Sequence, residues 1–295
     1  MGILAALAGI AGLVGSELGM FSVANPEVLI GAVVVGGAAT LFGFVYEIVR
    51  ELITRRHRPA HRHRGASVLL LLFFALVLAN AAAVPFFGDL FDALFGGGEL
   101  SLLGQVVVFM STQAALLSIV ALFVVVPGVF PAPLPRPGAS VARSALVGAL
   151  VAFPAWIGTN LAVLGFAWLF QRLGVPSEPT IVEELIANAN PLISAVAVVV
   201  AAPVAEEVFF RGVAFNAWLR EYGLRRAYLG SGFLFGLVHQ SLVVLVPFTA
   251  LGMLLAWVYR RTGSLAAPIA LHAVFNGTSL TIFLLERARI IDLPF

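Results

Sequence analysis

The sequence contains no cysteine and no lysine, and charged residues make up only 11% of its 295 positions. Without cysteine the chain can form no disulfide framework, thiol nucleophile or cysteine-bound metal site. Soluble domains usually carry about a quarter charged residues, so the low charge excludes an ordinary soluble enzyme. The net charge of +2 is small, and every basic residue is an arginine. We therefore expect a chain that is largely surrounded by lipid.

What the sequence has instead is long apolar runs, with 61% hydrophobic residues and a mean hydropathy of +1.04. A membrane-spanning helix needs roughly 20 apolar residues. The runs are continuous rather than alternating, which argues against a β-barrel. They cover 1–22, 28–49, 67–87, 102–130, 143–170, 191–217, 227–245, 246–259 and 264–285. Since some of these can be half-helices, we predict an all-α, polytopic membrane bundle of about eight transmembrane helices.

Arginine is concentrated in alternate connectors between these runs. The arginine-containing connectors are 50–64, 131–143, 220–226 and 260–261, whereas 88–100 and 171–190 are mainly acidic. Short arginine-rich loops remain in the cytoplasm, so we predict a multi-pass protein with its C-terminus outside. The compact loops and arginine-only usage favour the cytoplasmic (inner) membrane of a prokaryote.

Two connecting segments have features of their own. The arginine/histidine run at 55–64 has no aromatic platform or metal-ligand spacing, so we expect it to contact anionic lipid headgroups rather than nucleic acid. Residues 179–191 have an apolar face and predict an amphipathic helix in the membrane interface. We expect one integrated membrane domain, in which 1–175 are N-terminal helices without a motif and 176–295 form the functional core.

Ionisable residues inside membrane spans are costly and mark functional sites by default. In the second half of the chain these are Glu206, Glu207, Arg211, His239 and His272. Counting from the nearest cytoplasmic connector, Glu206 and His239 lie roughly 20 Å deep and His272 roughly 14 Å deep. Three helices therefore bring a carboxylate and two imidazoles to a similar depth, and we expect them to share one site.

Helical spacing separates the roles of the two adjacent glutamates. Glu207 and Arg211 are four residues apart, so we predict an ion pair on one helix face that positions the helix. Glu206 points about 100° away and is free for another task. Pro203 cannot donate a backbone hydrogen bond, which loosens the helix next to these groups.

The two histidines differ in their neighbours. Phe235 precedes His239 by one turn, and glycines at 230, 232 and 236 allow a neighbouring helix to approach closely. His272 and Asn276 are also one turn apart, and two such donors on one face suit an oxyanion.

Together with Glu206 these groups suggest hydrolysis, with the carboxylate accepting a proton from water. Glu206, His239 and His272 are equally a set that zinc could accept, with water as fourth ligand. The spacing differs from that of HExxH proteins, and spacing alone does not decide between metal-assisted and metal-free hydrolysis.

Three short motifs occur in order: EEVFFR at 206–211, FGLVH at 235–239 and HAVFN at 272–276. They match the EExxxR, FxxxH and HxxxN motifs of the CPBP family, the CAAX proteases and bacteriocin-processing enzymes, which the chain resembles over about 180–285. The resemblance implies an intramembrane endopeptidase whose site opens toward the cytoplasm.

The resemblance also assigns the residues of that site. It implies that Glu206 activates water with help from His239, that His272 and Asn276 form an oxyanion hole, and that Glu207, Arg211 and Phe235 support the site. It favours a metal-free mechanism without cofactor, and a peptide or membrane-protein substrate. The alternatives are a zinc-dependent membrane protease, a non-catalytic immunity or scaffold protein of the same fold, and a proton-coupled transporter. A transporter would more often show two homologous halves, and the sequence shows none.

Overall fold

The computed structural model describes residues 140–174, 190–239 and 241–291, together with isolated positions at 110, 113–117, 120, 121 and 186. All of these fall in one compact unit, Phe91–Phe295. The described part of this unit is helical and contains no strand. The apolar runs expected before residue 102 and the amphipathic helix expected at 179–191 lie outside the described residues, apart from Ile186 in the latter.

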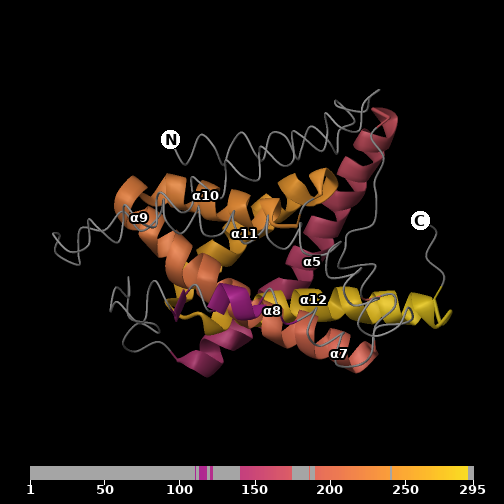
Figure 1. Cartoon of the computed structure of the whole chain (residues 1–295), viewed down its shortest axis with the longest axis horizontal. Coiled ribbons are helices and arrows are strands. Elements are labelled where there is room, and N and C mark those ends of the chain that lie inside the picture. The colour runs from indigo at the N-terminus through magenta and orange to yellow at the C-terminus, as the bar shows by residue number, and fades with distance from the viewer. Residues whose placement is uncertain are drawn as a thin grey trace, which may run out of the picture. The chain divides into compact units, whose positions relative to one another are not determined.

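Nine helical segments follow one another along this part of the chain (Figure 1). They are α5 (Val141–Arg172), α7 (Pro191–Ala195), η3 (Val196–Ala201), α8 (Ala202–Glu207), η4 (Val208–Phe215), α9 (Asn216–Tyr222), α10 (Leu224–Leu237), α11 (Leu242–Thr262) and α12 (Ala266–Arg287). The segments from α7 to α9 follow one another without a break and form one helical rod. Segments η3 and η4 are stretches of π-helix within this rod.

Four of the described helices are long and apolar enough to cross a bilayer: α5, the continuous rod Pro191–Arg220, α11 and α12. Apolar side chains of α5 such as Leu150, Leu161 and Trp168 are exposed, as expected for a surface that faces lipid. The chain is therefore an all-α membrane bundle. The expected total of about eight spans includes segments outside the described residues and stays a prediction.

One expected boundary is wrong. The apolar runs at 227–245 and 246–259 predicted a break near residue 245, but α10 ends at Leu237 and α11 begins at Leu242. The polar residues His239 and Ser241 lie in this break, and Ser241 has an extended backbone conformation. Pro247 lies within α11 near its N-terminal end, where the helix accommodates it.

Small residues determine how closely the helices pack. A Cβ at Gly236 would lie 2.5 Å from the Leu245 carbonyl oxygen, and one at Gly232 would lie 2.7 Å from that of Thr249. The expected close approach at these glycines is confirmed, and the neighbour is α11, which lies beside α10 in Figure 1. Gly230 instead faces the side chain of Trp218 in α9.

Two longer-range contacts attach α5 to α12. A Cβ at Gly148 would lie 1.9 Å from the carbonyl oxygen of Ala267, so the two backbones are nearly in contact. The Trp156 indole N–H donates to the Ser279 hydroxyl over 2.8 Å. Helix α12 thus runs between α5 on one side and the rod that carries the glutamates on another.

Candidate active site

The buried carboxylate of Glu207 joins two helices. Its Oε1 accepts a 2.8 Å hydrogen bond from Arg211 Nη1 and lies 2.9 Å from His272 Nδ1 of α12. All three side chains are buried, with at most 4% of any one exposed. The expected Glu207–Arg211 ion pair is confirmed. The contact with His272 was not expected, because it depends on how the two helices are rotated about their axes.

Arg211 is enclosed on its remaining sides. Its Nη2 donates to the backbone carbonyl of Gly252 in α11 over 2.9 Å. The guanidinium carbon lies 4.6 Å from the centre of the Phe235 ring of α10 and 5.6 Å from that of Phe210. Arg211 therefore connects the glutamate helix with both α10 and α11 through an ion pair, a charge-assisted hydrogen bond and cation–π contacts.

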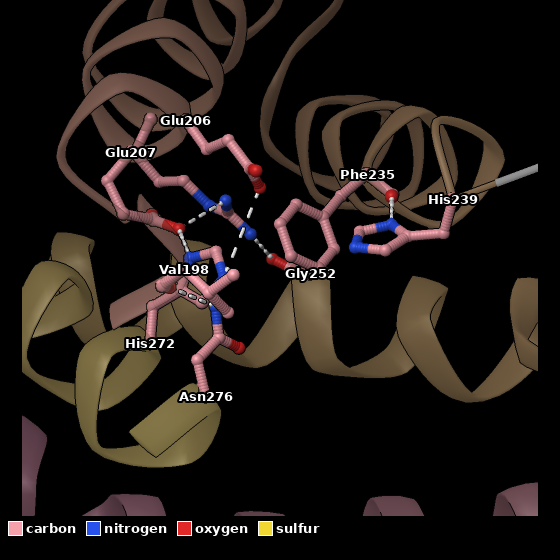
Figure 2. Close-up of polar contacts among 9 residues, drawn as sticks. Val198, Glu206, Glu207, Phe235, His239, Gly252, His272 and Asn276 are labelled. Carbon is pink, nitrogen blue, oxygen red and sulfur yellow. Dashed lines mark hydrogen bonds and ion pairs between the residues drawn. The ribbon is translucent and has the colours of Figure 1, made fainter. Parts of the chain in front are cut away.

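Glu206 points to the other side of the imidazole. Its Oε2 lies 4.0 Å from His272 Nε2, and the side chain is 18% exposed. This oxygen has no hydrogen-bond partner among the described residues. Figure 2 shows the two glutamates, Glu206 and Glu207, approaching the His272 ring from different directions. Glu206 is thus the carboxylate left free to bind water or another ligand.

The contacts of His272 define its protonation pattern. An ionised carboxylate only accepts hydrogen bonds, so the Nδ1 facing Glu207 carries a proton. In the neutral ring, Nε2 then has a lone pair and accepts a proton or a hydrogen bond from water beside Glu206. Nε2 becomes a donor only when the ring takes up a second proton, and that imidazolium would have a carboxylate at each nitrogen.

His239 lies apart from this cluster. Its Nδ1 is 2.7 Å from the Phe235 carbonyl oxygen, and its ring packs edge-on against Phe248 with 4.5 Å between ring centres. The Phe235 ring contacts both imidazoles, at 5.0 Å from His239 and 5.5 Å from His272, and lies between His239 and the glutamates in Figure 2. No hydrogen bond or ion pair joins His239 to Glu206 or His272 in the described part of the chain.

Asn276 lies one turn after His272 and makes a contact of its own. Its amide Nδ2 donates to the backbone carbonyl of Val198 in η3 over 2.9 Å. An amide nitrogen has two hydrogens, so one remains for a further partner. The structure thus gathers Glu206, Glu207, Arg211 and His272, with Asn276 next to them. The catalytic roles expected for these residues stay predictions.

Metal binding was the alternative for Glu206, His239 and His272. Among the described residues, no three His, Asp or Glu side chains lie close enough to hold one ion together. Glu206 and His272 alone could supply two ligands. The expected absence of a cofactor is a separate prediction, which metal analysis must test.

Three contributors were missed from the sequence: the Gly252 carbonyl, the Val198 carbonyl and the Phe248 ring. Backbone carbonyls carry no sequence pattern, and Gly252 is visible only as a small residue in an apolar run. The sequence does show Phe248 as an aromatic residue next to Pro247, in the segment that follows His239. Its place against His239 depends on the hairpin between α10 and α11.

Part of the chain is similar to a known protein family and to a curated relative. Residues 188–278 match the family model described as "Type II CAAX prenyl endopeptidase Rce1-like". The chain is also 35% identical over 117 residues to a Bacillus subtilis (strain 168) protein described as "Putative membrane peptidase YdiL". That match covers 40% of this chain and 47% of the relative, so the chain spans about half the length of the curated relative it matches. No solved structure matches the chain.

The matched region begins just before α7 and ends within α12, and it includes every residue of the cluster around Glu207. Its limits agree with the region of about 180–285 over which the three motifs resemble the CPBP family. Residues 188–278 are therefore similar to the type II CAAX prenyl endopeptidases of the Rce1-like family model, in agreement with the resemblance of the three motifs to the CPBP family.

Proposed function

We propose that the chain is an intramembrane endopeptidase that uses Glu206 to activate water. The observation that carries this proposal is the free Oε2 of Glu206, 4.0 Å from His272 Nε2. Two hydrogen bonds of about 2.8 Å can span that gap through one water molecule, at an angle of about 90°. The match to an endopeptidase family model and to a relative described as a membrane peptidase supports the reaction class.

In the proposed reaction Glu206 takes a proton from that water as its oxygen attacks the carbonyl carbon of the scissile peptide bond. The carbonyl oxygen becomes an oxyanion, which the second Asn276 N–H would stabilise, together with His272 once its Nε2 has taken up a proton from solvent. The carbon–nitrogen bond then breaks, and the proton held by Glu206 passes to the departing amine. The second proton of the water also ends on the amine, so the products are a carboxylate and an ammonium group, and no electron is gained or lost.

The supporting residues have separable tasks in this scheme. Glu207 orients the His272 ring through Nδ1, and Arg211 holds Glu207 in place. His239 would act through a bridging water or through the substrate, because Phe235 separates it from Glu206. The proposed substrate is a peptide or a membrane protein that enters from the cytoplasmic side of a prokaryotic inner membrane.

The decisive test replaces Glu206 with glutamine, which keeps the shape of the side chain but removes its basicity. Purified protein in liposomes is incubated with a peptide library in H₂¹⁸O, and new C-termini are read by mass spectrometry. We expect ¹⁸O-labelled products from the natural protein and a loss of about 10²- to 10⁴-fold for Glu206→Gln. The control is Glu286→Gln, which changes an exposed glutamate at the end of α12. Full activity of Glu206→Gln would overturn the proposal.

A zinc-dependent reaction is the alternative, and one contact favours it. Metal-binding histidines commonly donate their other ring nitrogen to a carboxylate, as His272 Nδ1 does toward Glu207. We nevertheless expect a metal-free enzyme, in which elemental analysis of active protein finds no zinc bound in proportion to the protein. One equivalent of zinc, with activity lost on chelation and restored by zinc alone, would establish the alternative and make Glu206 and His272 ligands.

A further inference from the structure

The rod that carries the glutamates changes its hydrogen-bonding register just before them. In η3 the backbone N–H of Ala202 bonds to the Ala197 carbonyl, five residues earlier. The next bond in that register would join residue 203 to the Val198 carbonyl. Residue 203 is a proline, which has no N–H. The backbone of this helix therefore leaves the Val198 carbonyl without its π-register partner.

A side chain of another helix occupies that position. The Nδ2 of Asn276 in α12 donates to the Val198 carbonyl oxygen over 2.9 Å. Pro203 is buried, and Asn276 is partly buried, so water is a poor substitute for the missing donor. A buried carbonyl without a partner costs free energy comparable to a lost hydrogen bond. The asparagine thus supplies the hydrogen bond that the proline cannot make.

The same bond sets the distance between the two helices of the site. Pro203 precedes Glu206 by three residues, and Asn276 follows His272 by four. The Asn276–Val198 bond and the His272–Glu207 bond are two connections between the same pair of helices, four residues apart on α12 and nine residues apart on the helix that carries the glutamates. A change in the first connection would move the His272 ring relative to both carboxylates.

We propose that Pro203 and Asn276 act as a complementary pair, in which Asn276 is a positioning residue that anchors α12 to the carbonyl left open by Pro203. This role uses one amide hydrogen of Asn276 and is independent of the oxyanion role suggested above, which needs the other. It predicts an unusual rescue: removal of the proline should compensate for removal of the asparagine. With an N–H at residue 203, the backbone itself can satisfy the Val198 carbonyl in the π register.

The experiment compares Asn276→Leu, Pro203→Ala and the double variant in detergent micelles. Leucine is close to asparagine in size but donates no hydrogen bond. We expect Asn276→Leu to lower Tm by roughly 2–8 °C, from the cost of an unpaired, partly buried carbonyl. In the Pro203→Ala background the same substitution should lower Tm by less than half as much. Pro154→Ala, at an exposed proline within α5, is the matched control and should give no rescue.

A second readout reports on position rather than on stability. In protein labelled with ¹⁵N-histidine, the His272 Nδ1–H bonded to Glu207 should give a resolved downfield proton signal, assigned by its loss in His272→Gln. We expect this signal to shift or broaden in Asn276→Leu and to return in the double variant. Equal loss of Tm by Asn276→Leu in both backgrounds, or an unchanged signal in Asn276→Leu, would overturn the pairing.

Peptidase activity distinguishes this inference from the proposed function. If Asn276 also donates to the oxyanion, the double variant should regain its Tm and its His272 signal but not its turnover. Recovery of turnover as well would leave the pairing in place and assign Asn276 a positioning role alone. Failure of the Tm rescue would overturn the pairing without bearing on whether Glu206 activates water.

Discussion

Replacing Glu207 with alanine should destabilise the protein more than any other single change at the site. Among the described residues, the substitution leaves the Arg211 guanidinium, which has no exposed surface, with the Gly252 carbonyl as its one hydrogen-bonding partner. It also removes the acceptor of His272 Nδ1. Breaking a buried ion pair by removing one partner costs about 3–5 kcal/mol, because the remaining charge is uncompensated. In a chain of this size that corresponds to a Tm decrease of roughly 6–20 °C.

The assay is thermal unfolding in detergent, followed by the fluorescence of the tryptophans or by light scattering. Glu206→Gln is the matched comparison, since Glu206 is partly exposed and its Oε2 has no partner among the described residues. We expect that variant to remain within about 1 kcal/mol of the natural protein, like most substitutions that break no buried interaction. The double variant Glu207→Leu/Arg211→Leu should lose less stability than Glu207→Ala, because it buries no unpaired charge. Equal losses for Glu206→Gln and Glu207→Ala would refute the division of roles between the two glutamates.

Two further predictions concern the neighbours of the site. Gly236→Ala should lower stability by about 1–3 kcal/mol through overpacking against α11. Gly158→Ala is the control, because a new Cβ there meets nothing within 4 Å, and it should not lower stability. Thermal unfolding of the two variants tests this prediction. Phe248→Ala should reduce kcat, because His239 loses its edge-on ring contact at 4.5 Å. The loss of that contact should lower stability by only about 0.5–1.5 kcal/mol. Retention of full kcat by Phe248→Ala would show that this contact does not hold His239 in a working position.

The sequence predicted the parts of the site that depend on local geometry. Glu207 and Arg211 form their ion pair because residues four apart on one helix lie on the same face, within reach of each other. The nearness of Glu206 to His272 followed from counting residues from the ends of two helices. Both arguments need only the rise and the angular period of a helix.

The parts that were missed depend on helix rotation and on side chains that come between others. The expected depth of His239 stays a prediction, but the Phe235 ring separates His239 from Glu206, and depth alone carries no information on that separation. The bond between Glu207 and His272 requires both helices to turn the right faces toward each other. Pro203 signalled a disturbed helix, yet the sequence did not predict π-helical stretches on both sides of α8.

The near contact between Gly148 and Ala267 has a practical consequence for anyone who wishes to express the motif-bearing region alone. A fragment that starts at the matched residues, near 188, would omit α5. It would leave the backbone at Ala267 and the hydroxyl of Ser279 exposed to lipid, where an unpaired polar group is costly. A truncation intended to retain a properly assembled His272 helix should therefore begin before Ser140, whose side chain caps α5.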